Sequence, residues 1–468
     1  MNKSRQQSDP FTRGLSDRHI QLIAIGGAIG VGLFLGSAKA IQTAGPALML
    51  SYALGGLVIF FIMRALGELA IYRPISGSFS TYAAEFIGPW AGFATGWTYW
   101  FMWVVTGMAE ITAVGMYAKF WFPQLPQWIP ALIALFFVYL INLIAVKLFG
   151  EVEFWFALIK VVTIIALIVI GLVMITTGWG NHGEPIGFSN LWSHQGFFPF
   201  GLTGVLFALQ MVMFAFLGVE LVGVTAGEAE NPEKTLPSAI NKILWRILIF
   251  YIGALAIIMA LYPWTDLDGK TSPFVLTFER IGIPAAAGII NFVVLTAALS
   301  SCNSGIFSTG RMLFTLASAK QAPQALARVS KRKVPATGIT VSSIALLIGV
   351  VLNYVIPEKA FTYITSIATT GAIWTWGIIV YAHLKYRKAV KEKGLPESSF
   401  KMPGAPWTNW LVLLFLGLVT VLLGLDSETR IALYVAPVWF GILAIGYQVV
   451  KARQKNAASD SESDPLAG

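Results

Sequence analysis

Residues 26–36 read GGAIGVGLFLG, which places five glycines inside a segment that is otherwise apolar enough to cross a lipid bilayer. Each glycine weakens a helix by about 1 kcal/mol relative to alanine, so the segment favours a local break in the helix. Unwound backbone at membrane depth is tolerated only where it is buried in protein or lines a cavity. Because freed N–H groups suit a carboxylate and freed carbonyls suit an ammonium or a cation, the break is a candidate site for a solute such as an amino acid.

The composition indicates a polytopic membrane protein. Of the 468 residues, 56% are hydrophobic and only 12% are charged, and the mean hydropathy is +0.71. Ordinary soluble domains contain roughly 25% charged residues. With about 20 to 25 apolar residues per span and short loops, roughly twelve transmembrane helices fit into this length.

Hydropathy and turn residues predict twelve helices and a polar tail. The approximate helix ranges are 20–42, 46–70, 88–119, 128–147, 153–177, 201–227, 243–264, 283–317, 336–355, 359–385, 408–425 and 430–450. We group the chain into a cytoplasmic N-terminal segment (1–19), a first half that includes an outer loop (20–200), a second half (201–385), a peripheral helix pair (386–452) and a disordered cytoplasmic tail (453–468).

The distribution of lysine and arginine predicts that both termini are cytoplasmic. With the N-terminus inside, 25 of the 32 basic residues fall in inner segments and six in outer ones, while Lys160 lies within the membrane. The basic residues are spread over several loops rather than gathered on one face. The net charge of +9 therefore gives no indication of nucleic acid binding.

A second interrupted helix is predicted within residues 201–227. There Gly218 and Gly223 flank the acidic Glu220 in an apolar setting. This helix would begin the second half of a ten-helix core, and two halves of five helices each must have opposite topology. Paired broken helices in inverted halves are typical of secondary transporters that bind solute near the membrane midplane. The alternative is that these glycines only allow helices to pack closely.

Five segments together resemble a known family. They read IAIGGAIGVGLFLGSA from Ile23, GSFSTYAAEFIGPWAGFATGWTYW from Gly77, GEVEFWFALIKV from Gly150, GVELVGVTAGEAENPEK from Gly218 and LTAALSSCNSGIFSTGRML from Leu295. They are similar to segments of the bacterial amino acid permeases of the amino acid/polyamine/organocation superfamily, and the resemblance runs from about residue 13 to residue 451. Within that family the chain looks most like the permease for D-serine, D-alanine and glycine, with the threonine/serine and proline permeases near behind. The resemblance implies the leucine-transporter fold, with a 5+5 inverted repeat and twelve helices, and amino acid uptake coupled to protons rather than sodium.

The resemblance also implies a substrate site at the two breaks. In the first break, the N–H groups of Val31 and Gly32 would bind the substrate carboxylate, and the carbonyl of Ala28 would accept the substrate ammonium. In the second break, the carbonyls of Phe214 and Leu217 would join the site. The ring of Phe216 resembles the aromatic group that closes over bound substrate, and its alternative role is an ordinary core or lipid contact.

Lys160 is the candidate for proton coupling. It has apolar neighbours on both sides, where an ionisable group costs about 2.5 to 3.5 kcal/mol to insert and indicates a function. The alternative is a lysine near a helix end whose stem reaches the membrane surface. In related proton-coupled permeases, a lysine in this helix places its ammonium where sodium-coupled relatives bind an ion beside the first break.

Three acidic residues also fall at membrane depth. Glu110 and Glu220 are weaker candidates for carrying the proton, and each has a structural hydrogen bond as its alternative. Glu68 follows Arg64 by four residues, which predicts an i,i+4 ion pair at the membrane edge.

The sequence does not favour an enzyme. It lacks the G-x-G-x-x-G spacing of a dinucleotide loop and the G-x-x-x-x-G-K-[ST] pattern of a nucleotide-driven pump. The four histidines are scattered and form no set of metal ligands. We therefore expect no catalytic residues, no cofactor and no metal.

Two classes of function remain. The preferred one is a proton-coupled symporter in the bacterial inner membrane that takes up small neutral amino acids such as glycine, alanine and serine, with the D-isomers of alanine and serine as further candidate substrates. The alternatives are a threonine or proline permease, an exchanger of amino acids, and a sensor that binds an amino acid without transporting it. The expected partners are the amino acid, the proton and the lipid bilayer, with neither nucleic acid nor an obligate protein partner.

Overall fold

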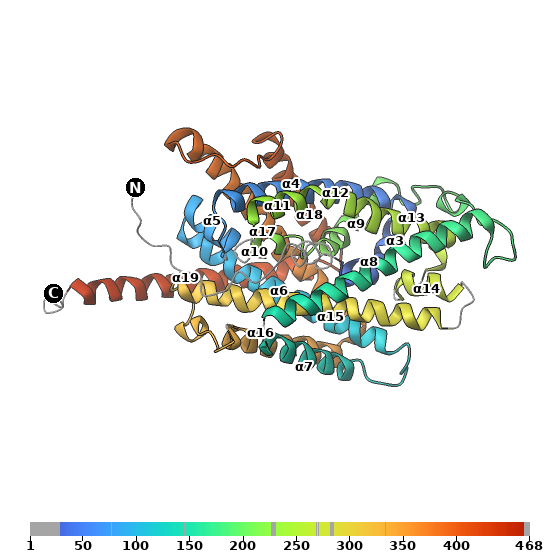
Figure 1. The fold of residues 1–468 in the computed structure, drawn as a ribbon, viewed down its shortest axis with the longest axis horizontal. Coiled ribbons are helices and arrows are strands. Elements are labelled where there is room, and N and C mark those ends of the chain that lie inside the picture. Colours follow the sequence, from blue (N-terminus) through green and yellow to red (C-terminus); the bar gives the residue numbers. More distant parts are fainter. Residues whose placement is uncertain are drawn as a thin grey trace.

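The computed structural model describes residues 29–462 except 76, 145, 226–230, 268, 270, 281–284 and 333. All regular secondary structure in these residues is helical (Figure 1). The helices are α2 (Val31–Phe34), α3 (Gly36–Ala44), α4 (Leu48–Tyr72), α5 (Ser78–Phe86), α6 (Pro89–Ala118), α7 (Trp128–Ile144), α8 (Val146–Thr177), α9 (Gly201–Ala215), α10 (Leu221–Thr225), α11 (Pro232–Asn241), α12 (Ile243–Arg246), α13 (Ala254–Leu261), α14 (Pro273–Arg280), α15 (Ala286–Ser318), α16 (Ala336–Val355), α17 (Pro357–Lys393), α18 (Trp407–Leu425) and α19 (Ile431–Glu462).

Within the described part of the chain, nine helices are long and apolar enough to cross a membrane. They are Gly36–Tyr72, Pro89–Ala118, Gly150–Thr177, Pro232–Leu261, Ala286–Ser318, Ala336–Val355, Pro357–Lys393, Trp407–Leu425 and Ile431–Asn456. Two shorter apolar helices, α7 and α9, fall at other predicted spans. The prediction of an all-helical polytopic protein is confirmed, while the count of twelve spans stays a prediction.

Several helices have a proline in their first turn. The 3-10 turn Gly45–Ala47 separates α3 from α4 and carries Pro46, while α6 begins at Pro89. Proline suits a first helical turn because its missing N–H has no partner there in any case. The prediction of separate first and second helices therefore matches the turn inside the long apolar stretch Gly36–Tyr72.

Three short helices lie in segments that the sequence left as loops. They are α5, α11 and α14, and each buries one face; α14, for example, buries Phe274, Val275 and Phe278. Helices of 8 to 10 residues are too short to cross a bilayer alone, and α11 forms the start of the longer apolar stretch Pro232–Leu261.

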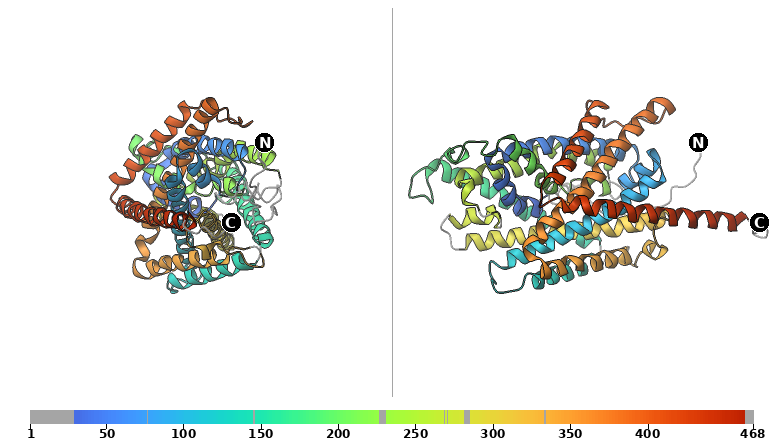
Figure 2. Two further views of the ribbon diagram at one scale, coloured as in Figure 1. Left: turned by 90° about the vertical axis from the view of Figure 1, so that its left-hand side faces the viewer. Right: turned by 180° about the vertical axis from the view of Figure 1, so that it is seen from behind.

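The centre of the molecule is α6, which packs against α15, α17, α5, α16 and α7 (Figure 1). In α6, 89% of the most apolar window is buried, against 39% in α18 and 6% in α19. Figure 2 shows α19 along the outside of the bundle, with its C-terminal part projecting beyond the other helices. In the first half of α19 the exposed side chains are mostly apolar, among them Val438, Ile442 and Ile445. This exposed apolar surface suits contact with lipid.

Candidate substrate and coupling site

The described part of the first glycine-rich segment is interrupted. Gly30 is extended, with φ −122° and ψ −158°, and α2 starts at the next residue. Leu35, with φ −111° and ψ −46°, then separates α2 from α3. Ala28, the predicted acceptor of the substrate ammonium, lies outside the described residues. Val31 and Gly32 open α2, where N–H groups lack acceptors within the helix.

The second predicted break is present in the structure. Helix α9 ends at Ala215, five residues follow in turns, and α10 begins at Leu221. Gly218 has φ +99°, a conformation that favours glycine and is incompatible with an α-helix, so the helix is interrupted at this residue. The Phe214 carbonyl accepts the N–H of Leu217 at 3.0 Å and therefore shares in closing the turn.

The two interruptions are in direct contact. A Cβ atom added to Gly32 would lie 2.5 Å from the Cα atom of Ala215, which is closer than real Cβ contacts allow. Helix α2 packs against α9, α15 and α6. Predicted site residues from opposite halves of the chain, Gly32 and the segment that follows Ala215, are thus brought together.

The aromatic residues of the second break face different neighbours. The ring of Phe216 packs against Tyr251 with centroids 5.0 Å apart and against Tyr52 at 5.8 Å. The ring of Phe214 meets Phe361 edge-on at 6.4 Å. In this conformation Phe216 serves as a packing contact, and its role in closing over substrate stays a prediction.

Glu110 lies against the first break. Its side chain is buried, and its Oε1 atom is 2.8 Å from the position that a Cβ atom of Gly30 would take. The Ser301 hydroxyl and the backbone N–H of Val31 both donate hydrogen bonds to the Glu110 carboxylate. One of the two amides predicted to bind the substrate carboxylate is thus bound to a carboxylate of the protein itself.

Lys160 is completely buried in the middle of α8, with 0% of its surface exposed. Its ammonium interacts with the carboxylates of Glu153 and Glu110. The alternative of a lysine that reaches the membrane surface is wrong. Lys160 is ten residues inside the span Gly150–Thr177, and its side chain is buried beside two carboxylates of the protein. Through Glu110, this lysine is linked to the first break.

Glu153 is a member of this cluster that the sequence reasoning missed. Its side chain is fully buried, and Ser300 donates a hydrogen bond to its Oε1 atom at 2.6 Å. Asn303 and Ser304 on the same helix, α15, lie beside this carboxylate. The available signal was spacing, because a residue seven positions before Lys160 lies two helical turns away on the same face.

Glu220 belongs to a different network. Its Oε2 atom accepts the backbone N–H of Gly218 at 3.3 Å and the indole N–H of Trp376 at 3.4 Å. The Trp103 side chain lies close to the same carboxylate. These bonds hold the turn between α9 and α10, which favours a structural role over a proton carrier.

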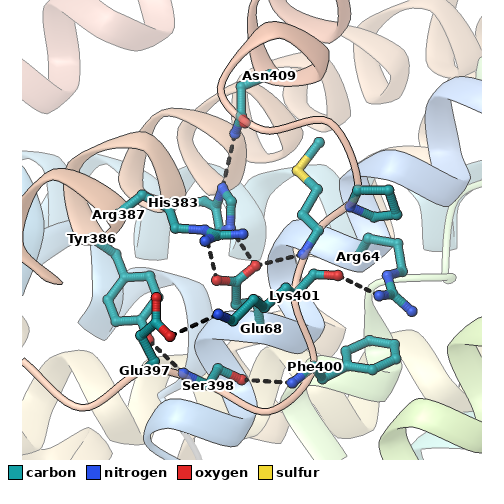
Figure 3. A network of polar contacts seen from close by, with 12 residues as sticks. Arg64, Glu68, His383, Tyr386, Arg387, Glu397, Ser398, Phe400, Lys401 and Asn409 are labelled. Carbon is teal, nitrogen blue, oxygen red and sulfur yellow. Dashed lines mark hydrogen bonds and ion pairs between the residues drawn. The ribbon is translucent and has the colours of Figure 1, made fainter. Parts of the chain in front are cut away.

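The predicted ion pair between Glu68 and Arg64 is wrong. Glu68 instead forms an ion pair with Arg387 of α17 (2.8 Å), lies 2.9 Å from the Nε2 atom of His383 on the same helix and accepts the N–H of Met402 at 2.6 Å (Figure 3). Arg64 turns away, donating to the Asn241 side chain at 2.9 Å and to the Lys401 carbonyl, with its guanidinium 3.7 Å from the Phe400 ring centroid. Spacing along one helix could not reveal a partner 315 residues away.

In the described residues, no group of three or more histidine, cysteine, aspartate or glutamate side chains could hold a metal ion. The arrangement can bind a zwitterion at interrupted backbone and can hold a proton among buried charged groups.

The family model described as amino acid permease matches residues 19–459. The chain belongs to the amino acid permease family. As a member, this permease is a multi-pass membrane transporter of amino acids and not an enzyme.

Curated relatives match nearly the whole permease. The uncharacterized amino acid permease YtnA of Bacillus subtilis is 58% identical over 458 residues, which cover 98% of this chain and 99% of the relative. The probable threonine/serine transporter YbxG of the same organism is 51% identical, covering 97% and 98%. The aromatic amino acid transport protein AroP of Escherichia coli K12 is 47% identical, covering 96% and 97%. The all-helical architecture and the family are consistent with the leucine-transporter fold.

Proposed function

We propose that this permease takes up small neutral amino acids together with protons across the bacterial inner membrane. In this proposal the chain has twelve spans, two inverted halves of five helices and cytoplasmic termini. The observation that carries the proposal is the buried cluster of Lys160, Glu153 and Glu110, which extends from α8 to the first helix break.

Proton coupling follows from the charges in this cluster. Two carboxylates and one ammonium leave one net negative charge in the bundle when all three groups are ionised. An uncompensated buried charge is costly, and a single added proton removes it. Since Glu110 contacts both Gly30 and the Val31 N–H, a change in protonation acts directly on the backbone that would bind substrate.

Substrate recognition in this proposal uses backbone groups of both breaks. The N–H groups of Val31 and Gly32 bind the carboxylate, and the carbonyls of Ala28, Phe214 and Leu217 bind the ammonium. Because Glu110 accepts the Val31 N–H in the present conformation, the substrate carboxylate would replace the Glu110 carboxylate at that amide. Protonation of Glu110 would free the amide, which couples proton binding to substrate binding.

The close contact between Gly32 and Ala215 limits the space where the two breaks meet. This contact supports the proposal that the substrates are small. A relative named as a probable threonine/serine transporter supports the same class. Aromatic amino acids are the second candidate class, because the AroP relatives are named for them. A panel of unlabelled L- and D-amino acids competing against labelled alanine separates these classes.

The test of the proposal is uptake into proteoliposomes with an imposed pH gradient. We expect labelled alanine to accumulate when the outside is acidic, to leak out when a protonophore is added, and to accumulate equally in sodium and choline media. Accumulation that follows a sodium gradient would contradict proton coupling. Counterflow without net accumulation would identify an exchanger, and binding without either would identify a sensor.

A further inference from the structure

A groove with a volume of about 650 Å³ opens on the outer surface of the bundle, beside α19. It lies between residues 93–100 near the start of α6, the connection from α15 to α16, and residues 439–454 in the middle of α19. Its volume falls within the range of ligand pockets, roughly 300 to 1,000 Å³. Because α19 has only 6% of its apolar window buried, the groove lies at the periphery of the bundle.

The walls of the groove are apolar. Phe93 and Trp97 contribute from α6, and Trp439 and Leu443 contribute from α19. The indole N–H of Trp97 donates to the Gln321 carbonyl at 3.3 Å, and that of Trp439 donates to Thr98 at 3.1 Å. Since both donors are used inside the protein, these rings offer hydrocarbon surface that suits an acyl chain.

Two cations stand at the groove. The side chains of Lys320 and Arg453 line it, both residues are exposed, and neither forms an ion pair with any residue that the structure describes. Neither residues 319–335 nor residues 447–459 contain aspartate or glutamate. Gln454 donates to the Lys320 carbonyl at 3.4 Å, which joins the two segments at this point. Positive charge beside an apolar groove complements a lipid with an anionic headgroup.

The backbone of Lys320 supplies an independent observation. Lys320 has φ +57°, the left-handed conformation that follows many helix ends and is usually occupied by glycine. A side chain is strained in this conformation because its Cβ atom crowds the following carbonyl. A lysine in place of glycine therefore indicates a use for its ammonium.

We propose that this groove binds one anionic phospholipid, with an acyl chain along Trp97, Trp439 and Leu443 and the phosphate between Lys320 and Arg453. The excess of lysine and arginine in the inner segments predicts that the end of the bundle that carries Lys320 and Arg453 is cytoplasmic. The cytoplasmic leaflet is the one rich in anionic lipid. The site rests on the cytoplasmic orientation of this end, which is part of the proposed function, and not on the proposed substrate or on proton coupling.

The test is lipid binding to the purified full-length protein by native mass spectrometry. Phosphatidylglycerol and phosphatidylcholine with identical acyl chains are titrated separately. We expect phosphatidylglycerol to bind about 30-fold more tightly, and K320Q/R453Q to lose this preference, because two surface cations that each contribute roughly 1 kcal/mol together give about 2 kcal/mol. Glycerol 3-phosphate, which has the charge without the acyl chain, is expected not to compete.

The matched control is K451Q/K455Q, which removes two charges from the same helix end at positions outside the groove lining. We expect it to keep the preference. The proposal is overturned if the two lipids bind equally, if the control loses the preference as fully as K320Q/R453Q, or if glycerol 3-phosphate displaces the lipid. A lipid-independent dimer that covers the groove would overturn it as well. Failure of amino acid uptake would leave these results unchanged, so the two proposals fail separately.

Discussion

At the scale of single residues, Glu153 and Lys160 share one face of α8 with their charges buried. Glu153→Gln keeps the shape of the side chain and removes its charge. We expect this variant to lose about tenfold in concentrative uptake and to change the dependence of uptake on external pH, because the buried ammonium then has one carboxylate partner fewer. The measurement is the initial rate of alanine uptake across a series of external pH values.

The control for this variant is Glu151→Gln, which lies two residues earlier on the same helix and is partly exposed. It should retain the wild-type profile. A Glu153→Gln permease whose pH profile coincides with that of the wild type would show that Glu153 takes no part in coupling.

Gly32 is the second residue whose replacement gives a sharp expectation. A Cβ atom there would overlap the backbone of Ala215, so Gly32→Ala forces α2 and α9 apart. Overpacking of this kind typically costs about 1 to 3 kcal/mol. We expect a lower melting temperature in detergent and little uptake. Gly417→Ala in α18 is the control, since no atom lies within 4 Å of its added Cβ. If Gly32→Ala melts and transports like the wild type, the direct contact between the two breaks is not required.

At the scale of elements, Glu68 fixes the connection between α17 and α18. Glu68 is buried and binds the N–H of Met402 within this connection, while the Tyr386 hydroxyl of α17 donates to the Pro396 carbonyl at 3.0 Å (Figure 3). The connection is thereby held against the end of α4. Its position depends on a buried charge rather than on regular secondary structure.

Removing that charge should release the connection. Breaking a buried ion pair from one side costs about 3 to 5 kcal/mol, so in Glu68→Gln we expect trypsin to cleave after Lys401 much faster than in the wild type. Glu397→Gln is the control, because the ion pair of Glu397 with Lys401 is exposed and screened by solvent, although the Lys401 ammonium lowers the pKa of the Glu397 carboxyl. Equal cleavage of wild type and Glu68→Gln would show that other contacts hold the connection.

At the scale of the whole molecule, hydropathy predicted the bounds of several long helices to within a residue. The sequence did not predict which polar side chains contact one another. The predicted ranges 88–119 and 336–355 correspond to α6 and α16 within one residue at each end. The predicted end at residue 385 fell short of Lys393, because α17 continues as a polar helix beyond its apolar part. The break between α9 and α10 was predicted correctly from Gly218 and Gly223. The partners of Glu68 and the role of Glu153 depend on helices that are distant in sequence, which no local pattern reports.

Proton coupling through Lys160 is tested most directly by comparing accumulation with exchange in Lys160→Ala. Both are measured with labelled alanine in the same proteoliposomes, the first under an inward proton gradient and the second as counterflow without a gradient. We predict that Lys160→Ala loses accumulation, because no buried ammonium remains to balance Glu153 and Glu110, while counterflow persists. Accumulation by Lys160→Ala to the level of the wild type would contradict the assignment, because Glu110 would then couple proton and substrate binding without the lysine.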